Sequence, residues 1–302
     1  MESPREGRGR GRRLSAPASS PLVDATWLID NLSLPGLVIL DARIARNPSD
    51  SLHPYASGRE DFERNGHIPG ARFADLMEDF SDPEARFLFT RPTNVALHAV
   101  MQRLGIHADS LVVVYDSLNG AWASRVWWVL RAYGHENVVV LDGGLQLWQQ
   151  AGGALAFGAG AEPGGGSFAP SERAGYFVDV PEVKAVADGV RAARLVCGSQ
   201  RADYTGDGSD ARRRGHIPRS SNLPYRELLD AHGRIDVEQV RVQLLHLGLE
   251  PADDVMLYCG GGINAAGVAL ALAAAGFDRP AIFDGSLNEW RADPALPLEV
   301  GS

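Results

Sequence analysis

The sequence predicts an α/β protein of two tandem domains, each a parallel sheet of about five strands with helices on both faces. Three observations predict this class. The chain has 302 residues, which is enough for two ordinary domains. Short apolar runs rich in β-branched residues alternate with helical patterns, as in parallel sheets covered by helices. The motifs of the first half recur in the second half, which indicates a duplicated unit.

The composition excludes several classes of function. The chain is 45% hydrophobic and 22% charged, which is typical of a globular protein. Its net charge of −9 argues against binding to nucleic acid or to an anionic membrane surface. No apolar run is long enough to span a bilayer. We therefore expect no nucleic-acid partner and no membrane association.

The internal repeat is carried by short segments in the same order in both halves, and the last three pairs share an offset of 142 or 143 residues. In chain order the pairs are Val38–Arg43 with Leu195–Gln200, Gly66-His-Ile-Pro69 with Gly215-His-Ile-Pro218, Val112–Asp116 with Val255–Cys259, Asp142–Leu145 with Asp284–Leu287, and Trp148 with Trp290. A spacing that is kept over half a domain indicates two copies of one fold.

The repeat and the composition set the expected boundaries. Residues 1–20 are rich in Arg, Gly and Ser and predict a disordered tail without the apolar core of a secretory signal. The first unit is expected over 21–153, a Gly- and Pro-rich linker over 154–175, and the second unit over 176–302. Helices are predicted over 94–104, 122–133, 237–247 and 265–275, each followed by a glycine suited to end a helix.

Cys259 is the main candidate for chemistry. It ends an apolar strand and is followed by three glycines and an alanine-rich helix. The open N–H groups at the start of that helix favour a thiolate, and the loop Gly260, Gly261, Gly262, Ile263 and Asn264 can wrap around a single charged atom. A phosphatase loop would need an arginine six residues after the cysteine, where this chain has Ala265. The first unit has Asp116 at the cysteine position, so only the second unit is expected to be catalytic.

The chain contains two cysteines, Cys197 and Cys259. They form no disulfide framework and do not have the spacing of a zinc site. An unpaired nucleophilic thiol suits a reducing compartment, so we predict a cytoplasmic protein. The chemistry proposed for Cys259 requires neither a metal nor an organic cofactor.

From Val23 to its end, the chain resembles the tandem-domain rhodaneses, the thiosulfate and 3-mercaptopyruvate sulfurtransferases. The resemblance is carried by the two Gly-His-Ile-Pro segments, the two Asp-Gly-[Gly/Ser]-Leu segments, the run Ser124–His135, the strand end Asp41-Ala-Arg43 and the Cys259 loop. It implies two rhodanese-like domains, with Cys259 taking a sulfane sulfur from a small donor as a persulfide. The sulfur then passes to cyanide, a small thiol or a thioredoxin-like protein. The alternative is a catalytically degenerate persulfide carrier or regulatory binding module.

The chain departs from the pattern of this family at several positions. Gly261 replaces a serine that would assist proton transfer, Asn264 replaces a threonine, and Phe89 lies where a histidine is expected. Asp203 stands where an arginine would bind the donor. We therefore expect Arg201 or Arg214 to bind the donor instead, and Asp75 to supply an acidic group at the cleft between the domains.

Cys197 leaves two hypotheses open. It ends a strand that should neighbour the strand ending at Cys259, so it is either a small buried residue or a resolving thiol that forms a disulfide with Cys259. The paired histidines His67 and His216 are expected to be structural, since only one unit is expected to be catalytic. The tryptophans at 127, 128, 148 and 290 are expected in the core.

Overall fold

The computed structural model describes residues 20–49, 54–162, 164–207, 213–277 and 280–301. Apart from residue 20, the predicted tail lies outside the described residues. The first unit contains a parallel five-stranded sheet of order β1-β7-β6-β2-β5. Its strands are β1 Leu22–Val23, β2 Leu37–Asp41, β5 Ala71–Phe73, β6 Leu111–Tyr115 and β7 Val138–Leu141.

The second unit contains a parallel sheet of order β10-β9-β11-β12-β8. Its strands are β8 Phe177–Val178, β9 Arg194–Cys197, β10 Ser220–Asn222, β11 Val255–Tyr258 and β12 Ala281–Phe283. Read from its other edge, the second sheet has the order β8-β12-β11-β9-β10, which matches the first sheet strand by strand. The two units therefore share one topology. This confirms the predicted fold class of two five-stranded parallel sheets.

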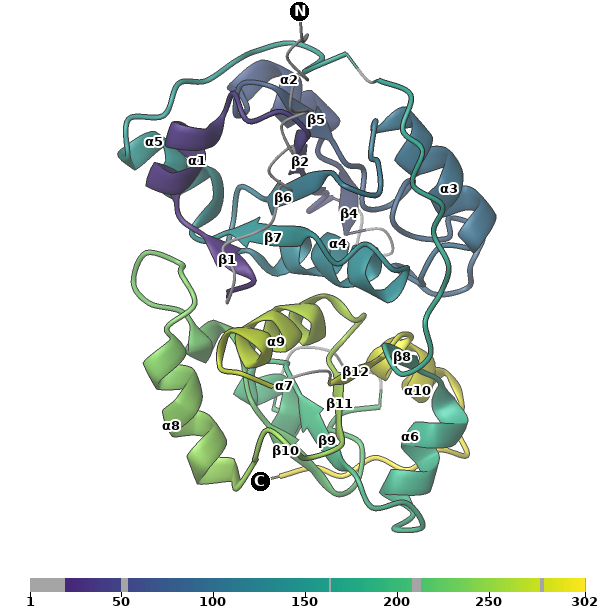
Figure 1. Cartoon of the computed structure of the whole chain (residues 1–302). Helices are drawn as coiled ribbons and strands as arrows, with labels where there is room; N and C mark the ends of the chain where they lie inside the picture. The colour runs from purple at the N-terminus through teal and green to yellow at the C-terminus, as the bar shows by residue number, and fades with distance from the viewer. Residues whose placement is uncertain (1–19, 50–53, 163, 208–212, 278–279, 302) are drawn as a thin grey trace, which may run out of the picture.

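Helices cover both faces of each sheet (Figure 1). In the first unit they are α1 Ala25–Asn31, α2 Arg59–Asn65, α3 Asn94–Arg103, α4 Ala121–Ala132 and α5 Gly144–Gln150. In the second they are α6 Val180–Ala187, α7 Arg201–Thr205, α8 Val237–Leu247, α9 Ile263–Ala274 and α10 Ser286–Ala292, with a 3₁₀ helix η1 over Tyr225–Leu228. The strands β3 Ile44–Arg46 and β4 Tyr55–Ser57 form a separate antiparallel pair. In the described part of the chain, no helix has the length and apolar character needed to cross a membrane.

The helices α4 and α9 pack against each other between the two units (Figure 1). They are equivalent helices of the repeat: α4 is the helix after β6 and Asp116, and α9 is the helix after β11 and Cys259. One continuous apolar core includes both helices and one face of each sheet. The two units are therefore joined by a buried interface that lies next to the Cys259 loop.

The described residues of the predicted linker form no helix or strand, apart from an isolated bridge between Ala156 and His67. Figure 1 shows this segment passing over the first unit before it enters β8. Its backbone is held by hydrogen bonds, for example from Ala161 N to Ala71 O and from Phe168 N to Ile106 O. The segment is therefore packed along the first unit and does not bridge the units as a free tether.

Candidate active site

Cys259 lies at the carboxyl end of β11, and only 3% of its surface is exposed. Its backbone N–H donates to Ser286 Oγ at 3.2 Å, and that hydroxyl donates to Phe283 O at 2.9 Å. Ser286 has a φ of 50°, a left-handed conformation that costs energy in any residue with a side chain. The strained serine fixes the backbone from which the Cys259 thiol projects.

Gly262 is the one loop glycine that takes a left-handed conformation, with φ of 83° at the start of α9. A methyl group at this position would lie 3.2 Å from both Arg125 Nη1 and Asp284 O. Neither Gly260 nor Gly261 has a positive φ. The need for glycine is therefore strictest at Gly262, where the chain turns into the helix beside the first unit.

The equivalent loop of the first unit surrounds the side chain of Asp116. One carboxylate oxygen accepts hydrogen bonds from Leu118 N at 2.8 Å and Gly120 N at 3.0 Å. The other accepts from Trp122 N at 3.1 Å and Ala123 N at 3.0 Å. Burial raises the pKa of Asp116, and these backbone hydrogen bonds oppose that effect. The loop and helix start of this repeat thus direct several N–H groups at the side chain that ends the strand.

Residues of the first unit bind the carboxylate of Asp284, which lies close to the support of Cys259. Arg125 on α4 is fully buried and donates from Nη2 to Asp284 Oδ1 at 2.5 Å and to Phe89 O at 2.5 Å. Arg91 binds the other oxygen of Asp284 through its backbone N–H at 2.8 Å and its Nη1 at 3.2 Å. Asp284 lies two residues before Ser286, so these contacts connect the first unit to the support of Cys259.

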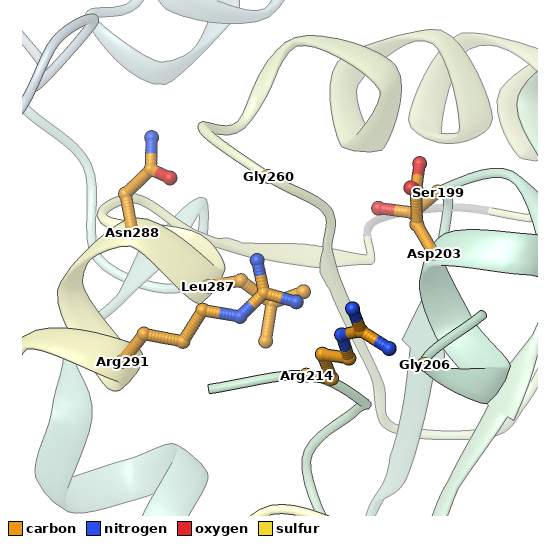
Figure 2. Close-up of a pocket in the computed structure, with 8 residues that line it drawn as sticks. All are labelled: Ser199, Asp203, Gly206, Arg214, Gly260, Leu287, Asn288 and Arg291. Atoms are coloured by element: carbon orange, nitrogen blue, oxygen red, sulfur yellow. The ribbon is translucent and has the colours of Figure 1, made fainter. Parts of the chain in front are cut away.

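A pocket of about 190 Å³ lies beside Gly260. The polar side chains that line it are those of Ser199, Asp203, Arg214, Asn288 and Arg291. Figure 2 shows Arg291 and Arg214 in the lower half of the view, and Asp203 with Ser199 at the upper right. The pocket therefore presents both signs of charge next to the candidate nucleophile.

The structure separates the predicted donor-binding residues. Arg214 lines the pocket beside Gly260, but Arg201 does not; its guanidinium pairs with Glu227 at 2.9 Å and its side chain is 63% exposed. Asp75 is held within the first unit, where it accepts from Ser57 Oγ at 2.5 Å and from Met77 N at 3.1 Å.

Arg291, Arg125 and Asp284 were not among the predicted site residues. The sequence carries a signal for Arg291, which follows Trp290 where the first unit has Gln149 after Trp148. A charged residue in only one copy of a repeat indicates a position at which the two copies differ chemically. Arg125 also carries a signal, because it is the one charged residue in the otherwise mostly apolar segment 121–130, and a charge in such a segment needs a buried partner.

The position of the Cys197 side chain contradicts the hypothesis of a disulfide with Cys259. Strands β9 and β11 are neighbours as predicted, with Cys197 paired to Tyr258. Because side chains alternate along a strand, Cys197 and Tyr258 share one face, and both belong to the core cluster on that face. Cys259 belongs to the cluster on the opposite face. Burial raises the pKa of the Cys197 thiol to about 11, as expected of a small buried residue.

The two repeated histidines have equivalent structural contacts. His67 Nδ1 lies 3.1 Å from Phe62 O, and its ring stacks on Phe62 at 3.9 Å between centroids. His216 Nδ1 lies 2.8 Å from Tyr204 O, and its ring stacks on Tyr204 at 3.7 Å. The tryptophans at positions 127, 128, 148 and 290 are buried, as predicted.

The site and the fold define a rhodanese-like protein, and comparison with known proteins agrees. The rhodanese-like domain matches residues 24–151 and 199–293, so the chain belongs to the rhodanese family. The chain is 34% identical to a probable 3-mercaptopyruvate sulfurtransferase of Pseudomonas aeruginosa, over 94% of this chain and 99% of that one. It is 35% identical to the putative thiosulfate sulfurtransferase SseB of Mycobacterium tuberculosis, over 78% and 84%.

A solved structure gives the same result. The crystal structure of SseA from Escherichia coli, described as a 3-mercaptopyruvate sulfotransferase with the rhodanese fold, matches with a TM-score of 0.78 and 30% identity. The match covers 89% of this chain and 99% of that one. The chain is therefore an enzyme of the sulfurtransferase class.

Proposed function

We propose that the protein transfers a sulfane sulfur from thiosulfate or 3-mercaptopyruvate to a thiol or cyanide through a persulfide on Cys259. The observation that carries the proposal is the set of four backbone N–H groups that bind the Asp116 carboxylate, called the cradle below. In a persulfide the outer sulfur is two bonds from Cβ, and so are the carboxylate oxygens of an aspartate. The Asp116 side chain is thus an internal analogue of a Cys259 persulfide, in the equivalent loop of the same fold.

The repeat indicates which backbone N–H groups would donate hydrogen bonds to the proposed persulfide. Gly120 and Gly262 both have left-handed conformations and begin equivalent helices. Counting from these glycines, the N–H groups of Gly262, Asn264 and Ala265 correspond to three of the four that bind Asp116. We infer that they hold the outer sulfur, as preorganised amides hold an oxyanion.

Both half-reactions balance without a cofactor. In the first, the Cys259 thiolate attacks the outer sulfur of thiosulfate, the S–S bond breaks, and sulfite leaves with the electron pair. With 3-mercaptopyruvate the C–S bond breaks, and pyruvate forms after its carbon takes up a proton. In the second, an acceptor thiolate or cyanide attacks the outer sulfur and regenerates the Cys259 thiolate. A free thiolate of this kind suits a reducing compartment, and the proposal places the reaction in the cytoplasm.

A persulfide carrier is the second candidate, favoured by the surroundings of Gly261. A methyl group added there would lie 3.7 Å from the Phe89 ring and 3.1 Å from the Asn288 amide nitrogen. Neither group delivers a proton at neutral pH, which would slow turnover with donors whose leaving group needs one. A carrier would hold one sulfur on Cys259 but would not turn over with small acceptors.

Steady-state assays with each donor and with cyanide as the acceptor distinguish the two. The wild type and Cys197→Ala, which changes only the buried thiol of the other face, are expected to turn over. Cys259→Ser is expected to lose all turnover. Equal rates in wild type and Cys259→Ser would overturn the proposal, and one stable sulfur per chain without turnover would support the carrier.

A further inference from the structure

The pocket beside Gly260 has an unusual charge pattern for a site that binds a simple dianion. Arg214 and Arg291 suit an anionic group such as a carboxylate, because guanidinium groups bind carboxylates with paired hydrogen bonds. Asp203 lines the same pocket, on the side of Ser199. A carboxylate at that place repels a second negative charge and attracts an ammonium group. The lining is therefore complementary to a zwitterion.

The loop itself restricts the leaving group. The three residues after Cys259 are glycines, and the groups that flank Gly261 are a phenyl ring and an amide. Cleavage of a C–S bond leaves a carbanion-like product that must be protonated as it departs. Cleavage of an S–S bond leaves a thiolate, which is stable in water near neutral pH and needs no proton from the enzyme.

We propose that the preferred donor is the hydropersulfide of an α-amino acid thiol, with its carboxylate bound by Arg214 and Arg291 and its ammonium by Asp203. This inference rests on the proposed persulfide chemistry of Cys259 and adds a class of donor to thiosulfate and 3-mercaptopyruvate. It ranks S–S donors above 3-mercaptopyruvate. It also gives Asp203 a role, the binding of the ammonium group, whereas in a site for a dianion this carboxylate would repel the ligand.

The sulfur-transfer step balances. The Cys259 thiolate attacks the terminal sulfur of R–S–SH, a new S–S bond forms at Sγ, and the donor S–S bond breaks. The electron pair leaves on the thiolate R–S⁻, which takes a proton from water, while the new persulfide loses its proton to solvent. No external oxidant or reductant is consumed.

The test compares cysteine hydropersulfide with two analogues, each of which lacks one of its two charged groups. They are those of cysteine, of 3-mercaptopropionate, which lacks the ammonium, and of cysteamine, which lacks the carboxylate. The rate of sulfur addition to the full-length protein is followed by intact-protein mass spectrometry. We expect cysteine hydropersulfide to react about tenfold faster than either analogue, since each lost group removes a charge-assisted hydrogen bond.

Matched variants locate this preference. Asp203→Asn is expected to remove the discrimination against the 3-mercaptopropionate donor, and Arg291→Gln the discrimination against the cysteamine donor. Arg191→Gln is the control, because it removes one charge from a pair with Asp254 away from this pocket and should change neither ratio.

Each outcome has a definite meaning. Equal rates for the three donors, or a preference that survives in Asp203→Asn and in Arg291→Gln, would overturn this inference and leave the Cys259 persulfide intact. A protein that accepts sulfur from none of the three donors, nor from thiosulfate or 3-mercaptopyruvate, would overturn the proposed function as well.

Discussion

At the scale of single residues, Cys259 and Asp116 show how one loop can serve two purposes. In both units this residue directly follows a buried strand, and a left-handed glycine caps the start of the next helix. The first unit fills its cradle permanently with a carboxylate that receives four backbone hydrogen bonds. The second unit has a thiol there, which leaves the cradle to the sulfur that we propose Cys259 carries.

The two thiols should differ sharply in reactivity. Burial raises the pKa of Cys197 to about 11, so its thiolate is scarce at about pH 8. Iodoacetamide is therefore expected to label the native protein once, at Cys259, as measured by peptide mass spectrometry. Cys259→Ser should remain unlabelled, and rapid labelling of Cys197 in the native protein would contradict its buried position.

Gly262 and Gly260 should respond differently to the same substitution. Gly262→Ala places a methyl group 3.2 Å from Arg125 Nη1 on a backbone with φ of 83°, so we expect a loss of about 1–3 kcal/mol in the free energy of unfolding. Gly260→Ala is the control, because its added methyl group meets no atom within 4 Å and its φ is not positive. Urea denaturation of both variants checks this, and equal losses would contradict it.

At the scale of elements, the two Asp-Gly turns bind across the interface reciprocally. Asp284 of the second unit accepts from Arg91 and Arg125 of the first. Its counterpart Asp142 of the first unit accepts from Ile235 N of the second at 3.0 Å. Each turn thus connects the end of a sheet to the other unit, and in the second unit that connection adjoins the Cys259 loop.

Breaking the buried pair at this interface should be costly. Arg125→Gln leaves the Asp284 carboxylate, 4% exposed, with fewer partners, and we expect a loss of about 3 kcal/mol in unfolding free energy. The control Arg64→Gln removes an exposed pair with Glu60 and should cost less than about 0.5 kcal/mol. Urea denaturation measures both, and a cost for Arg125→Gln no larger than that of the control would show that the network does not hold the interface.

Asp142 should make the stability depend on pH. Burial raises its pKa from 3.8 to about 6 in the folded protein. The folded state therefore keeps a proton that the unfolded chain has lost, and the stability from Asp142 is fully present below about pH 3.8 and is lost as the pH rises through about 6. Relative to Asp142→Asn, the wild type should lose unfolding free energy between about pH 4 and 6, with no further change above about pH 7. A difference that is independent of pH over this range would refute the assignment.

At the scale of the whole molecule, the repeat carried most of the fold prediction. Helix α8 was predicted at its observed bounds, and α3, α4 and α9 were predicted to within two residues, because glycines mark their ends. The two units share one sheet order, as expected of paired motifs that follow in the same order along the chain. What a sequence of this kind conveys well is the order of elements in each unit.

The charged groups around Cys259 were harder to predict, because they come from distant parts of the chain. Arg291, Arg214 and Asp203 lie on three separate segments, and only the closed fold brings them to one pocket. Arg201 was favoured because it is close to Asp203 in sequence, but its pairing with Glu227 depends on η1. The side on which Cys197 packs depended on strand register, which the sequence alone did not fix.

The central claim is that Cys259 carries the transferred sulfur. The most direct measurement is peptide mass spectrometry of the full-length protein after brief treatment with a sulfur donor and alkylation of the product. We predict one added sulfur atom on the peptide that contains Cys259, lost on treatment with cyanide and absent from Cys259→Ser. An added sulfur that is found on Cys197, or that persists in Cys259→Ser, would contradict the account.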